Sequence, residues 1–566
     1  METGEHGKQS LSTSLPVSLS TFYRPILWLL PLSFLALAFF FPLSKILALT
    51  FDLESLTAAN LRIAYQVLGF TLYQATLSTL LTLLLGLPSA YLFARYNFRG
   101  KSLLRALTAV PFMLPTVVVA ASFNALLGQR GLINFIFSPF SFIIHPSPFI
   151  LILFAHIFYN TTIIIRVVGN ALSSLDPRLE QTARSLGADS FHVWWNVVLP
   201  IIRPSVLASS LLVFLFDFTS FGVILLLGGS QFSTLEVEIY LRVLKLPNLS
   251  LAALLSVIQL ICTIIVSILY TRVVTRSTTQ TAPRSESSNL RKPKTLRERI
   301  FVAFFIFLLS SFFILPLASL PTRSFFRLEA DRGQRGEIQY GFTTDYYTEL
   351  FVNRRGSVFY VPPIKATTNS LAYAGATVVL SLLLGFPAAF ALAKPTRLEK
   401  ILVPLIMLPL GSSAVMLGLG FIISYGKWLT LPWLVPFAHT LVALPFVIRT
   451  LQPAIVSIPE KLRQAASSLG ASPLEVWRNI DLPILRRATL TGATFAFTIS
   501  LGEFGATLLI SRPEYPTIPV AIERFLSQPG GLNYGQAMAM ASILMLLTTA
   551  SILLIEKLRL PNSGEF

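Results

Sequence analysis

Four ionisable side chains stand inside apolar stretches of this sequence, where a charged or strongly polar group is costly. Asp217 and Glu503 are carboxylates in two of these stretches, and His156 and His439 are imidazoles in two others. Ionisable groups in apolar spans usually face the interior of a helix bundle or a water-filled path. Asp217 and Glu503 could therefore line a polar path, or they could form hydrogen bonds that pack helices together. The sequence alone leaves both interpretations open.

The two histidines are a weak basis for a metal site. No cysteine, aspartate or glutamate stands near either one in the sequence, and bound metal ions need several such ligands. Cys262 is the single cysteine, which excludes an internal disulfide and a cysteine-based metal site. We expect structural histidines and no metal site. No set of carboxylate, histidine and cysteine converges within one half of the chain, which disfavours a membrane-embedded enzyme.

A short basic segment imitates the end of a phosphate-binding loop. Arg99, Gly100, Lys101 and Ser102 follow one another, but Arg95 stands where the first glycine of such a loop is required. We interpret the segment as a basic connection between spans. The chain is therefore expected to lack its own ATPase site, to be no enzyme and to bind no cofactor itself.

The composition is that of a membrane protein. Of 566 residues, 54% are hydrophobic and 12% are charged, and the mean hydropathy is +0.69; ordinary soluble domains have roughly a quarter of their residues charged. Because lipid offers backbone groups no hydrogen bonds, long continuous apolar runs predict helices. The net charge of +18 would suggest a nucleic-acid partner in a soluble protein, but here the basic residues lie in short loops. We expect membrane lipid and no nucleic acid as a partner.

The apolar runs predict about twelve membrane-spanning helices, at about 20 residues for each crossing. In the first half they are Pro25–Leu47, Val67–Phe93, Ala106–Leu127, Phe149–Asn170, Ser205–Leu227 and Leu251–Val273. In the second half they are Ile300–Leu320, Ser370–Ala393, Ile401–Ser424, Leu431–Ile448, Ala488–Ile510 and Gln536–Ile555.

Charge in the loops orients these spans. Loops rich in Lys and Arg stay in the cytoplasm, and all but one of the basic loops fall on one side if the N-terminus is inside. The opposite loops are poorer in Lys and Arg and carry Glu236 and Glu238; the basic segment 322–365 is an exception. We predict a bacterial plasma-membrane protein with both termini cytoplasmic. Its predicted parts are an N-terminal segment (1–24), a first transmembrane domain (25–273), a linker (274–299), a second transmembrane domain (300–557) and a tail (558–566).

The two halves are copies of one another. His156 and His439 are 283 positions apart, and at the same offset Leu199-Pro200 matches Leu482-Pro483 and Phe221-Gly222 matches Phe504-Gly505. Each half has an even number of predicted spans, so the copies run in the same direction. This pattern is typical of a parallel duplication about an axis along the membrane normal.

One cytoplasmic loop occurs in both copies with the same spacing. It predicts a short helix ended by a glycine, a second short helix with apolar residues on one face (Phe191, Trp194 and Val198 in the first copy), and a proline that starts the next span. Two short helices with exposed aromatic side chains favour docking on a partner. The residues of the two loops are Gln181, Thr182, Ala183, Gly187, Trp194, Leu199 and Pro200, and Gln464, Ala465, Ala466, Gly470, Trp477, Leu482 and Pro483.

These loops resemble the E-A-A-x3-G-x9-I-x-L-P signature of the permeases of bacterial type I ABC importers. The resemblance implies an all-α permease of two parallel six-helix repeats. It implies two copies of a separate ATP-binding subunit, which carry ATP and Mg and receive the two loops. It also implies a solute-binding protein on the external face. Gln181 and Gln464 replace the glutamate of the signature, so the docking shape is kept while the charge is lost.

Within that class, the chain is similar to the ferric-iron and thiamine permease group. The similarity is carried by Leu227–Tyr240, Ser500–Gly505 and Phe154–Asn160. It implies import of a small solute by alternating access, with ferric iron as the first expectation and thiamine or a related solute as the alternative. An ion-coupled secondary transporter is the alternative of another class, because such proteins also use repeats and broken helices.

Overall fold

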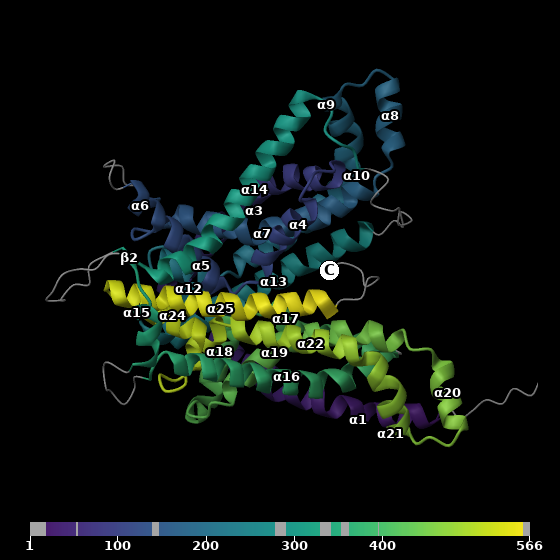
Figure 1. Ribbon diagram of the computed structural model, residues 1–566. Helices are drawn as coiled ribbons and strands as arrows, with labels where there is room; N and C mark the ends of the chain where they lie inside the picture. The colour runs from purple at the N-terminus through teal and green to yellow at the C-terminus, as the bar shows by residue number, and fades with distance from the viewer. Residues whose placement is uncertain are drawn as a thin grey trace, which may run out of the picture.

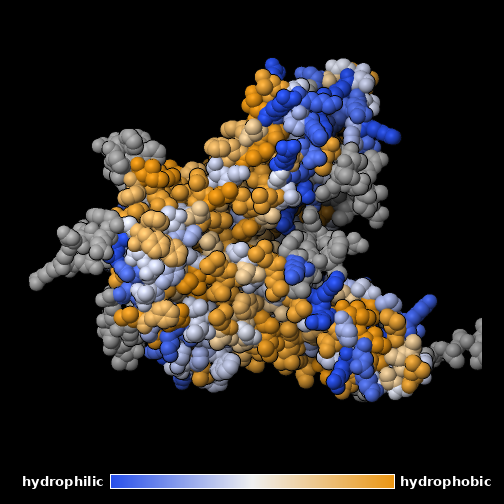
Figure 2. All heavy atoms as spheres, viewed as in Figure 1, coloured by the Kyte–Doolittle hydropathy of each residue, from blue (hydrophilic) through white to orange (hydrophobic). Residues whose placement is uncertain are grey.

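The computed structural model describes residues 18–52, 55–137, 146–277, 290–328, 341–352, 361–393 and 395–558. Within these ranges the chain is almost wholly helical, apart from one two-stranded antiparallel ribbon. Most of the predicted N-terminal segment and tail, and residues 278–289 of the predicted linker, lie outside the described residues. Hydrophobic residues cover the middle of the molecule, and hydrophilic residues gather at its two ends (Figure 2).

The first half begins with an almost continuous span, α1, η1 and α2, and ends with α13. In chain order its elements are α1 (Ser18–Leu35), η1 (Ala36–Phe40), α2 (Phe41–Thr50), α3 (Ala58–Arg95), α4 (Lys101–Met113), α5 (Thr116–Leu127), α6 (Leu132–Phe137), α7 (Pro148–Ser174), α8 (Pro177–Ser185), α9 (Ser190–Val193), η3 (Trp194–Val198), α10 (Leu199–Phe218), α11 (Gly222–Gly228), α12 (Leu235–Leu244) and α13 (Leu249–Ser277).

The second half repeats this order, with a small additional segment after its first helix. Its elements are α14 (Leu296–Phe325), β1 (Phe326–Arg327), β2 (Gly341–Phe342), α15 (Asp345–Thr348), η5 (Glu349–Phe351), α16 (Ile364–Ala393), α17 (Arg397–Gly411), α18 (Ala414–Tyr425), η6 (Gly426–Trp428), α19 (Leu434–Val456), α20 (Glu460–Ser468), α21 (Pro473–Val476), η7 (Trp477–Asp481), α22 (Leu482–Gly502), α23 (Gly505–Ile510), α24 (Ile518–Leu526) and α25 (Gly531–Leu558).

The described residues contain ten helices that are long and apolar enough to cross a membrane, or eleven if one pair bent by 92° counts as a single span. The bent pair, α17 and α18, is the predicted span Ile401–Ser424. The predicted span Ala488–Ile510 is not among them: it corresponds to α22 and α23, and Thr, Ser, Gly and Arg residues dilute the apolar character of α22. The fold class is confirmed as an all-α, polytopic protein built from two copies of one repeat.

Besides the bent pair α17 and α18, three further predicted spans are each broken into two helices. Ala106–Leu127 divides into α4 and α5, Ser205–Leu227 into α10 and α11, and Ala488–Ile510 into α22 and α23. Run length could not find these breaks, because Leu114 and Phe221, which lie at two of them, are themselves apolar. The acidic helix α12 is a second difference from the sequence analysis. Glu236 and Glu238, which were expected in a loop, lie buried in this helix.

The first helix of each half packs against the other half. α1 contacts α16 and α2 contacts α18, while α14 contacts α4 and α5. Trp28 on α1 is buried and donates a hydrogen bond from Nε1 to Glu399 on α17, 3.3 Å away. The two halves are therefore interlocked at their first helices. Away from this junction they diverge into two arms, one ending in α8 and α9 and the other in α20 and α21 (Figure 1).

Within each half, a glycine lets two long helices cross at close range. A Cβ placed on Gly86 of α3 would lie 2.7 Å from Cβ of Ile164 on α7, and one placed on Gly385 of α16 would lie 2.8 Å from Val447 on α19. Ile164 and Val447 are themselves repeat partners. The duplicated bundle therefore depends on the same backbone approach in both copies.

We expect Gly86→Ala to destabilise the protein by about 1–3 kcal/mol, because the added methyl group overpacks the α3–α7 crossing. Thermal unfolding of the purified protein measures the effect. The loss should be smaller in an Ile164→Ala background, since that change removes two of the three clashing atoms, Cγ1 and Cγ2, and leaves only Cβ. Gly375→Ala on α16 is the matched control, because nothing lies within 4 Å of its added Cβ. An equal loss in both glycine variants would contradict this account of the crossing.

Candidate functional site

The first loop of the duplicated motif forms a helix, α8, that ends at Gly187. The amide of Ala188 donates to the carbonyl oxygen of Ala183 (3.1 Å), and the amide of Gly187 donates to that of Arg184 (3.0 Å). This pair of bonds is the Schellman arrangement, which requires a left-handed residue after the helix. Gly187 supplies it with φ +89°. The predicted glycine stop is confirmed in its geometry.

The second loop ends its helix, α20, in the same way. The amide of Ala471 donates to the carbonyl oxygen of Ala466 and that of Gly470 to Ser467, each at 3.0 Å, and Gly470 has φ +84°. Ala183 and Ala466 are half-buried at matching positions, and the two residues before each of them are exposed. The two loops therefore present matching surfaces at the tips of the two arms.

Each tip carries a prominent apolar side chain beside its glycine. Leu186 is 83% exposed and Leu469 is 89% exposed. Exposed apolar groups of this kind, at the end of a short helix and repeated in both copies, are suited to insertion into a partner surface. Gln181, Thr182, Gln464 and Ala465 lie on the same helices and are also exposed.

The second short helix of each loop runs without interruption into the next span. From the sequence, a proline was expected to separate the two. Pro200 and Pro483 lie in the first turn of α10 and α22, and one π-helical turn, η3 or η7, joins each span to the short helix before it. In η3 the amide of Leu199 bonds to the carbonyl oxygen of Trp194, five residues back. A proline inside a helix clashes with the carbonyl four residues earlier, and the wider turn accommodates it.

The aromatic residues of this second helix do not all face outward. Trp194 is half-buried and packs edge-on against Tyr91 of α3, with ring centroids 5.6 Å apart. Phe191 and Trp195 are the exposed aromatic side chains of this helix, and their rings stack with centroids 6.2 Å apart. Phe191 is therefore exposed as a docking aromatic would be, whereas Trp194 and Val198, predicted on the same face, turn toward the protein. Trp477 in the second copy is 37% exposed.

Carboxylates fix the start of each second helix. Asp189 accepts hydrogen bonds from the amide of His192 (2.8 Å) and from its imidazole, and these lower the pKa of the Asp189 carboxyl. Glu475 accepts hydrogen bonds from the amide and hydroxyl of Ser472, which lower the pKa of its carboxyl. Both carboxyls are solvent-exposed. Because both pKa values lie below the usual range, these contacts are kept at neutral pH and are lost only under acid conditions.

An ion pair ties each loop to the rest of its half, and the sequence analysis did not identify it. Glu180 on α8 pairs with Arg95 at the end of α3, whose side chain is 7% exposed. At the repeat position, Arg463 on α20 pairs with Asp481 (2.8 Å). The signal in the sequence is that positions 180 and 463 carry opposite charges beside the same motif. The helix α8 therefore contributes the acidic partner of its ion pair, whereas α20 contributes the basic partner.

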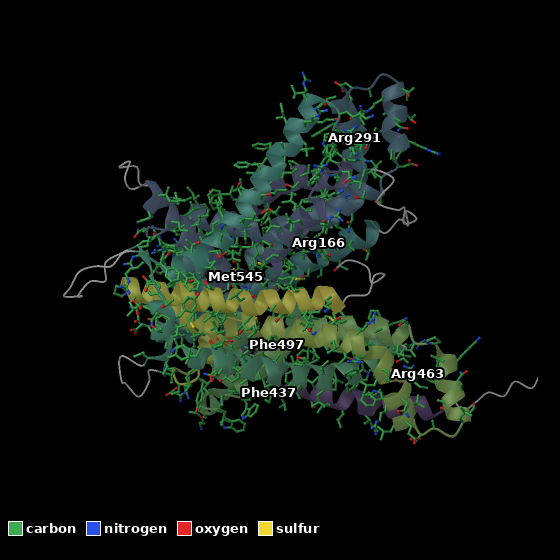
Figure 3. The ribbon with its side chains drawn as sticks, in the orientation of Figure 1. Arg166, Arg291, Phe437, Arg463, Phe497 and Met545 are labelled. Atoms are coloured by element: carbon green, nitrogen blue, oxygen red, sulfur yellow. The ribbon has the colours of Figure 1, made fainter. Side chains whose placement is uncertain are left out.

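Arg291, in the predicted linker between the two halves, contacts the segment that carries Arg95. The amide of Arg291 donates to the carbonyl oxygen of Arg95 (3.0 Å), and the amide of Asn97 donates back to that of Arg291 (2.9 Å). The Arg291 guanidinium also lies over the ring of Tyr96, 5.3 Å from its centroid. Figure 3 places Arg291 in the arm that carries α8, and Arg463 in the arm that carries α20.

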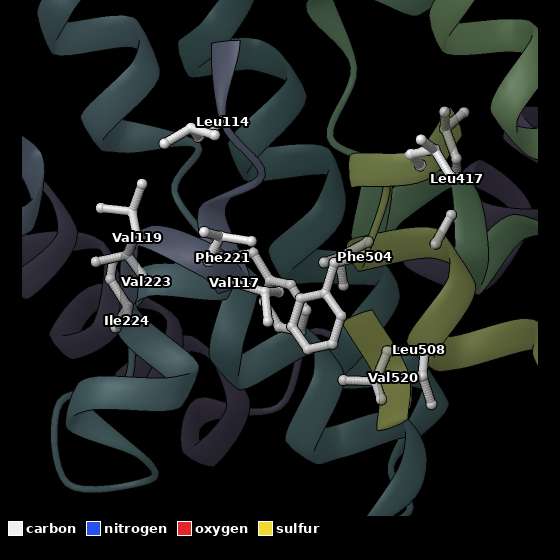
Figure 4. Close-up of a cluster of buried hydrophobic side chains, with 14 of the residues drawn as sticks. Leu114, Val117, Val119, Phe221, Val223, Ile224, Leu417, Phe504, Leu508 and Val520 are labelled. Atoms are coloured by element: carbon white, nitrogen blue, oxygen red, sulfur yellow. The ribbon is translucent and has the colours of Figure 1, made fainter. Parts of the chain in front are cut away.

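Far from the loops, the breaks in the spans meet between the two halves. Phe221 lies in the break between α10 and α11, and Phe504 lies in the break between α22 and α23. Their rings stack across the two halves, with centroids 5.4 Å apart and planes inclined by 29° (Figure 4). Both are almost fully buried, at 7% and 3% exposed. Phe221 and Phe504, called here the aromatic pair, fill the junction of the two repeats.

In the first half, His156 lies beside the break that carries Phe221. Its Nε2 is 2.9 Å from Oγ of Ser220, and its Nδ1 is 2.7 Å from Nε2 of Gln74. Nδ1 also lies 3.6 Å from Oδ1 of Asp217, which accepts a 2.7 Å hydrogen bond from Asn160. Asp217 is fully buried, so the described structure places it among helices and not at an open surface.

In the second half, His439 occupies the matching place beside Phe504. Its Nδ1 is 2.7 Å from Oγ of Ser500, and its Nε2 is 3.2 Å from Oε2 of Glu503. Glu503 also accepts the amide hydrogens of Ala506 (2.8 Å) and Thr507 (3.0 Å) at the start of α23. The structure therefore brings each histidine together with one of the two predicted carboxylates. Among the described residues, no three His, Cys, Asp or Glu side chains converge as a metal site would need.

We expect Gly187→Val and Gly470→Val together to abolish activation of the ATP-binding subunit that the sequence leads us to expect, while membrane insertion is unchanged. No neighbour lies within 4 Å of either added Cβ, so the effect comes from the left-handed backbone, which β-branched residues avoid at a cost of about 1–2 kcal/mol each. ATPase activity of the purified complex measures the result. Asn tolerates this conformation, so the Asn double variant should keep most of the activity; equal losses in both would contradict the argument.

The sequence profile of a known family matches each half of the chain. The family is described as the binding-protein-dependent transport system inner membrane component, and it matches residues 82–279 and 381–559. The two matches contain the two loops and both members of the aromatic pair. The resemblance drawn from the loops is therefore confirmed by the rest of each repeat.

Curated relatives align with nearly the whole chain. A thiamine transport system permease protein ThiP of Brucella abortus (strain 2308) is 28% identical over 505 residues, which are 87% of each protein. The protein of the same name from Escherichia coli (strain K12) is 25% identical over 510 residues, 87% of this chain and 89% of its own. A probable ABC transporter permease protein y4fN of Sinorhizobium fredii is 24% identical over 531 residues, 91% of each. With two copies of the family's repeat, two matching loops and full-length relatives, the chain belongs to the binding-protein-dependent inner-membrane components and is a fused permease of an ABC importer.

Proposed function

We propose that this permease imports thiamine or a closely related planar, cationic solute. The observation that carries the proposal is the similarity to thiamine permeases, which extends over 87% of the chain and of the Brucella relative. The substrate is thus the alternative of the sequence analysis and not ferric iron, which none of the relatives named above transports by its printed name. Permeases of this family work with an ATPase and a substrate-binding protein.

The arrangement of the loops supports a division of labour between the two ends of the molecule. One ATP-binding subunit docks on α8 and a second copy docks on α20, at the tips of the diverging arms. ATP and Mg belong to these subunits. The binding protein docks at the opposite end, where α12, α15 and α24 lie (Figure 1). The arms and both chain termini then face the cytoplasm, and the protein spans the bacterial inner membrane.

The aromatic pair closes the path between the halves in this conformation. Phe221 and Phe504 each lie in a break of a span, and the helices before these breaks, α10 and α22, continue without interruption to the two loops. Movement of the loops by ATP-driven closure of the subunits therefore acts on the helices that hold the two rings. Stacked aromatic rings also suit a planar cation, since ring faces attract positive charge.

We expect proteoliposomes that contain the permease with its ATP-binding subunit to take up radiolabelled thiamine when the binding protein and ATP are supplied. Ferric citrate in parallel vesicles tests the competing substrate. The Gly187→Val/Gly470→Val variant is the matched control, because its membrane helices are unchanged while its loops are distorted.

Two results would overturn the proposal. Uptake of ferric iron in place of thiamine would return the substrate to the first expectation of the sequence analysis. Thiamine uptake that continues without ATP and follows an imposed ion gradient would indicate a secondary transporter.

A further inference from the structure

Each histidine beside the aromatic pair contacts the same two positions of its own half, through the same two nitrogens. Nδ1 faces position 217 in the first half and position 500 in the second; Nε2 faces position 220 and position 503. These positions are repeat partners. One lies in the last turns of the long helix before the break, and the other lies at the break itself.

The carboxylate occupies opposite positions in the two halves. In the first half Asp217 faces Nδ1 and Ser220 faces Nε2. In the second half Ser500 faces Nδ1 and Glu503 faces Nε2. At this pair of positions each half thus has one acid and one hydroxyl, in reversed order. A further hydroxyl contacts each ring: Ser78 lies 3.1 Å from Nδ1 of His156, and Thr507 lies 2.7 Å from Nε2 of His439. The surrounding residues follow the exchange: Asn160 donates to Asp217, and Thr507 donates to Glu503.

We propose that His156 and His439, each with its acid and hydroxyl, are positioning clamps for the aromatic pair. The clamps are defined as His156, Asp217 and Ser220, and His439, Ser500 and Glu503. Each clamp links one residue before a break and one residue in the break to the long helix α7 or α19, and the residue that follows in the break is Phe221 or Phe504. The clamps require one carboxylate for each histidine, and either position can supply it.

Burial explains why a clamp must hold a single acid and cannot lack one. The clamp residues are at most 8% exposed, so water does not satisfy their polar groups. Removal of the acid leaves buried donors without an acceptor, and a second acid adds an unpaired buried charge; both are costly in an apolar interior. In either case the break is released, and the adjacent phenylalanine is free to move out of the stack.

This inference rests on the proposed role of the aromatic pair in closing the path, but not on the identity of the substrate. Leak of potassium ions therefore tests it directly. The permease with its ATP-binding subunit is reconstituted into potassium-loaded vesicles without ATP or binding protein, and potassium release is recorded. Asp217→Ser should raise the leak at least fivefold over the wild type. Ser209→Ala, a buried hydroxyl of α10 that bonds only to its own helix in the described structure, should leave it unchanged.

An exchange variant separates a clamp from a general packing defect. Asn160→Ala, Asp217→Ser, Ser220→Glu and Ile224→Thr together give the first half the residues that the second half carries at the four repeat positions. This variant should return the leak to within twofold of the wild type, whereas Ser220→Glu alone should leak. The thermal unfolding temperature of each variant is measured as well. A variant that leaks while its unfolding temperature is unchanged has lost the clamp and not its fold.

Two outcomes would sink the proposal. One is an unchanged leak in Asp217→Ser, which would show that the clamp does not hold the ring. The other is a leak that persists in the exchange variant although its unfolding temperature matches that of the wild type. Failure of thiamine uptake, with the expected pattern of potassium leak, would contradict only the proposed substrate.

Discussion

The structure depends on one constraint: a helix broken inside an apolar bundle leaves backbone groups that only the protein can satisfy. At three of the breaks in this chain, a side chain pairs with a backbone group that the break leaves without its helical partner. Tyr159 donates its hydroxyl to the carbonyl oxygen of Leu114 after α4. Ser413 accepts the amide of Met416 at the start of α18. Glu503 accepts two amides at the start of α23. These partners satisfy backbone groups inside the bundle, and Glu503 does so directly beside Phe504.

Much of the architecture could be predicted from the sequence, because it follows from properties that vary slowly along the chain. Apolar run length gave the long spans, and matching residues at one offset gave the duplication. The left-handed conformation of Gly187 and Gly470 followed from residue type, since little else ends a helix in that way. These are local signals, and they need no knowledge of what packs against them.

The parts that could not be predicted are those set by contacts between distant segments. Trp194 turns inward because Tyr91, on another helix, offers it a surface. Asp217 and Glu503 are not repeat partners, so the sequence gives no reason to compare them. In the structure, each lies beside the histidine of its own half, one toward Nδ1 and the other toward Nε2. This shared neighbour is the basis for giving them the same role. Glu236 was expected in a loop between spans, yet it lies in a helix and accepts hydrogen bonds from Gln259 and from Ser413 of the other half.

Fusion of the two halves into one chain explains how such reversed pairs can be stable. In a dimer of identical subunits, any change in one copy appears in both, so an acid could not move to a different position in one half alone. Here each half always meets the other and never a second copy of itself within the chain. Glu180 and Arg463 can then carry opposite charges, each with a partner to match. Contacts across the halves can also be one-sided: Gly502 admits Pro115 of the first half, whose ring would lie 3.2 Å from an added Cβ. The repeat preserves the backbone geometry that both halves need. The fusion allows the side chains that stabilise this geometry to differ between the halves.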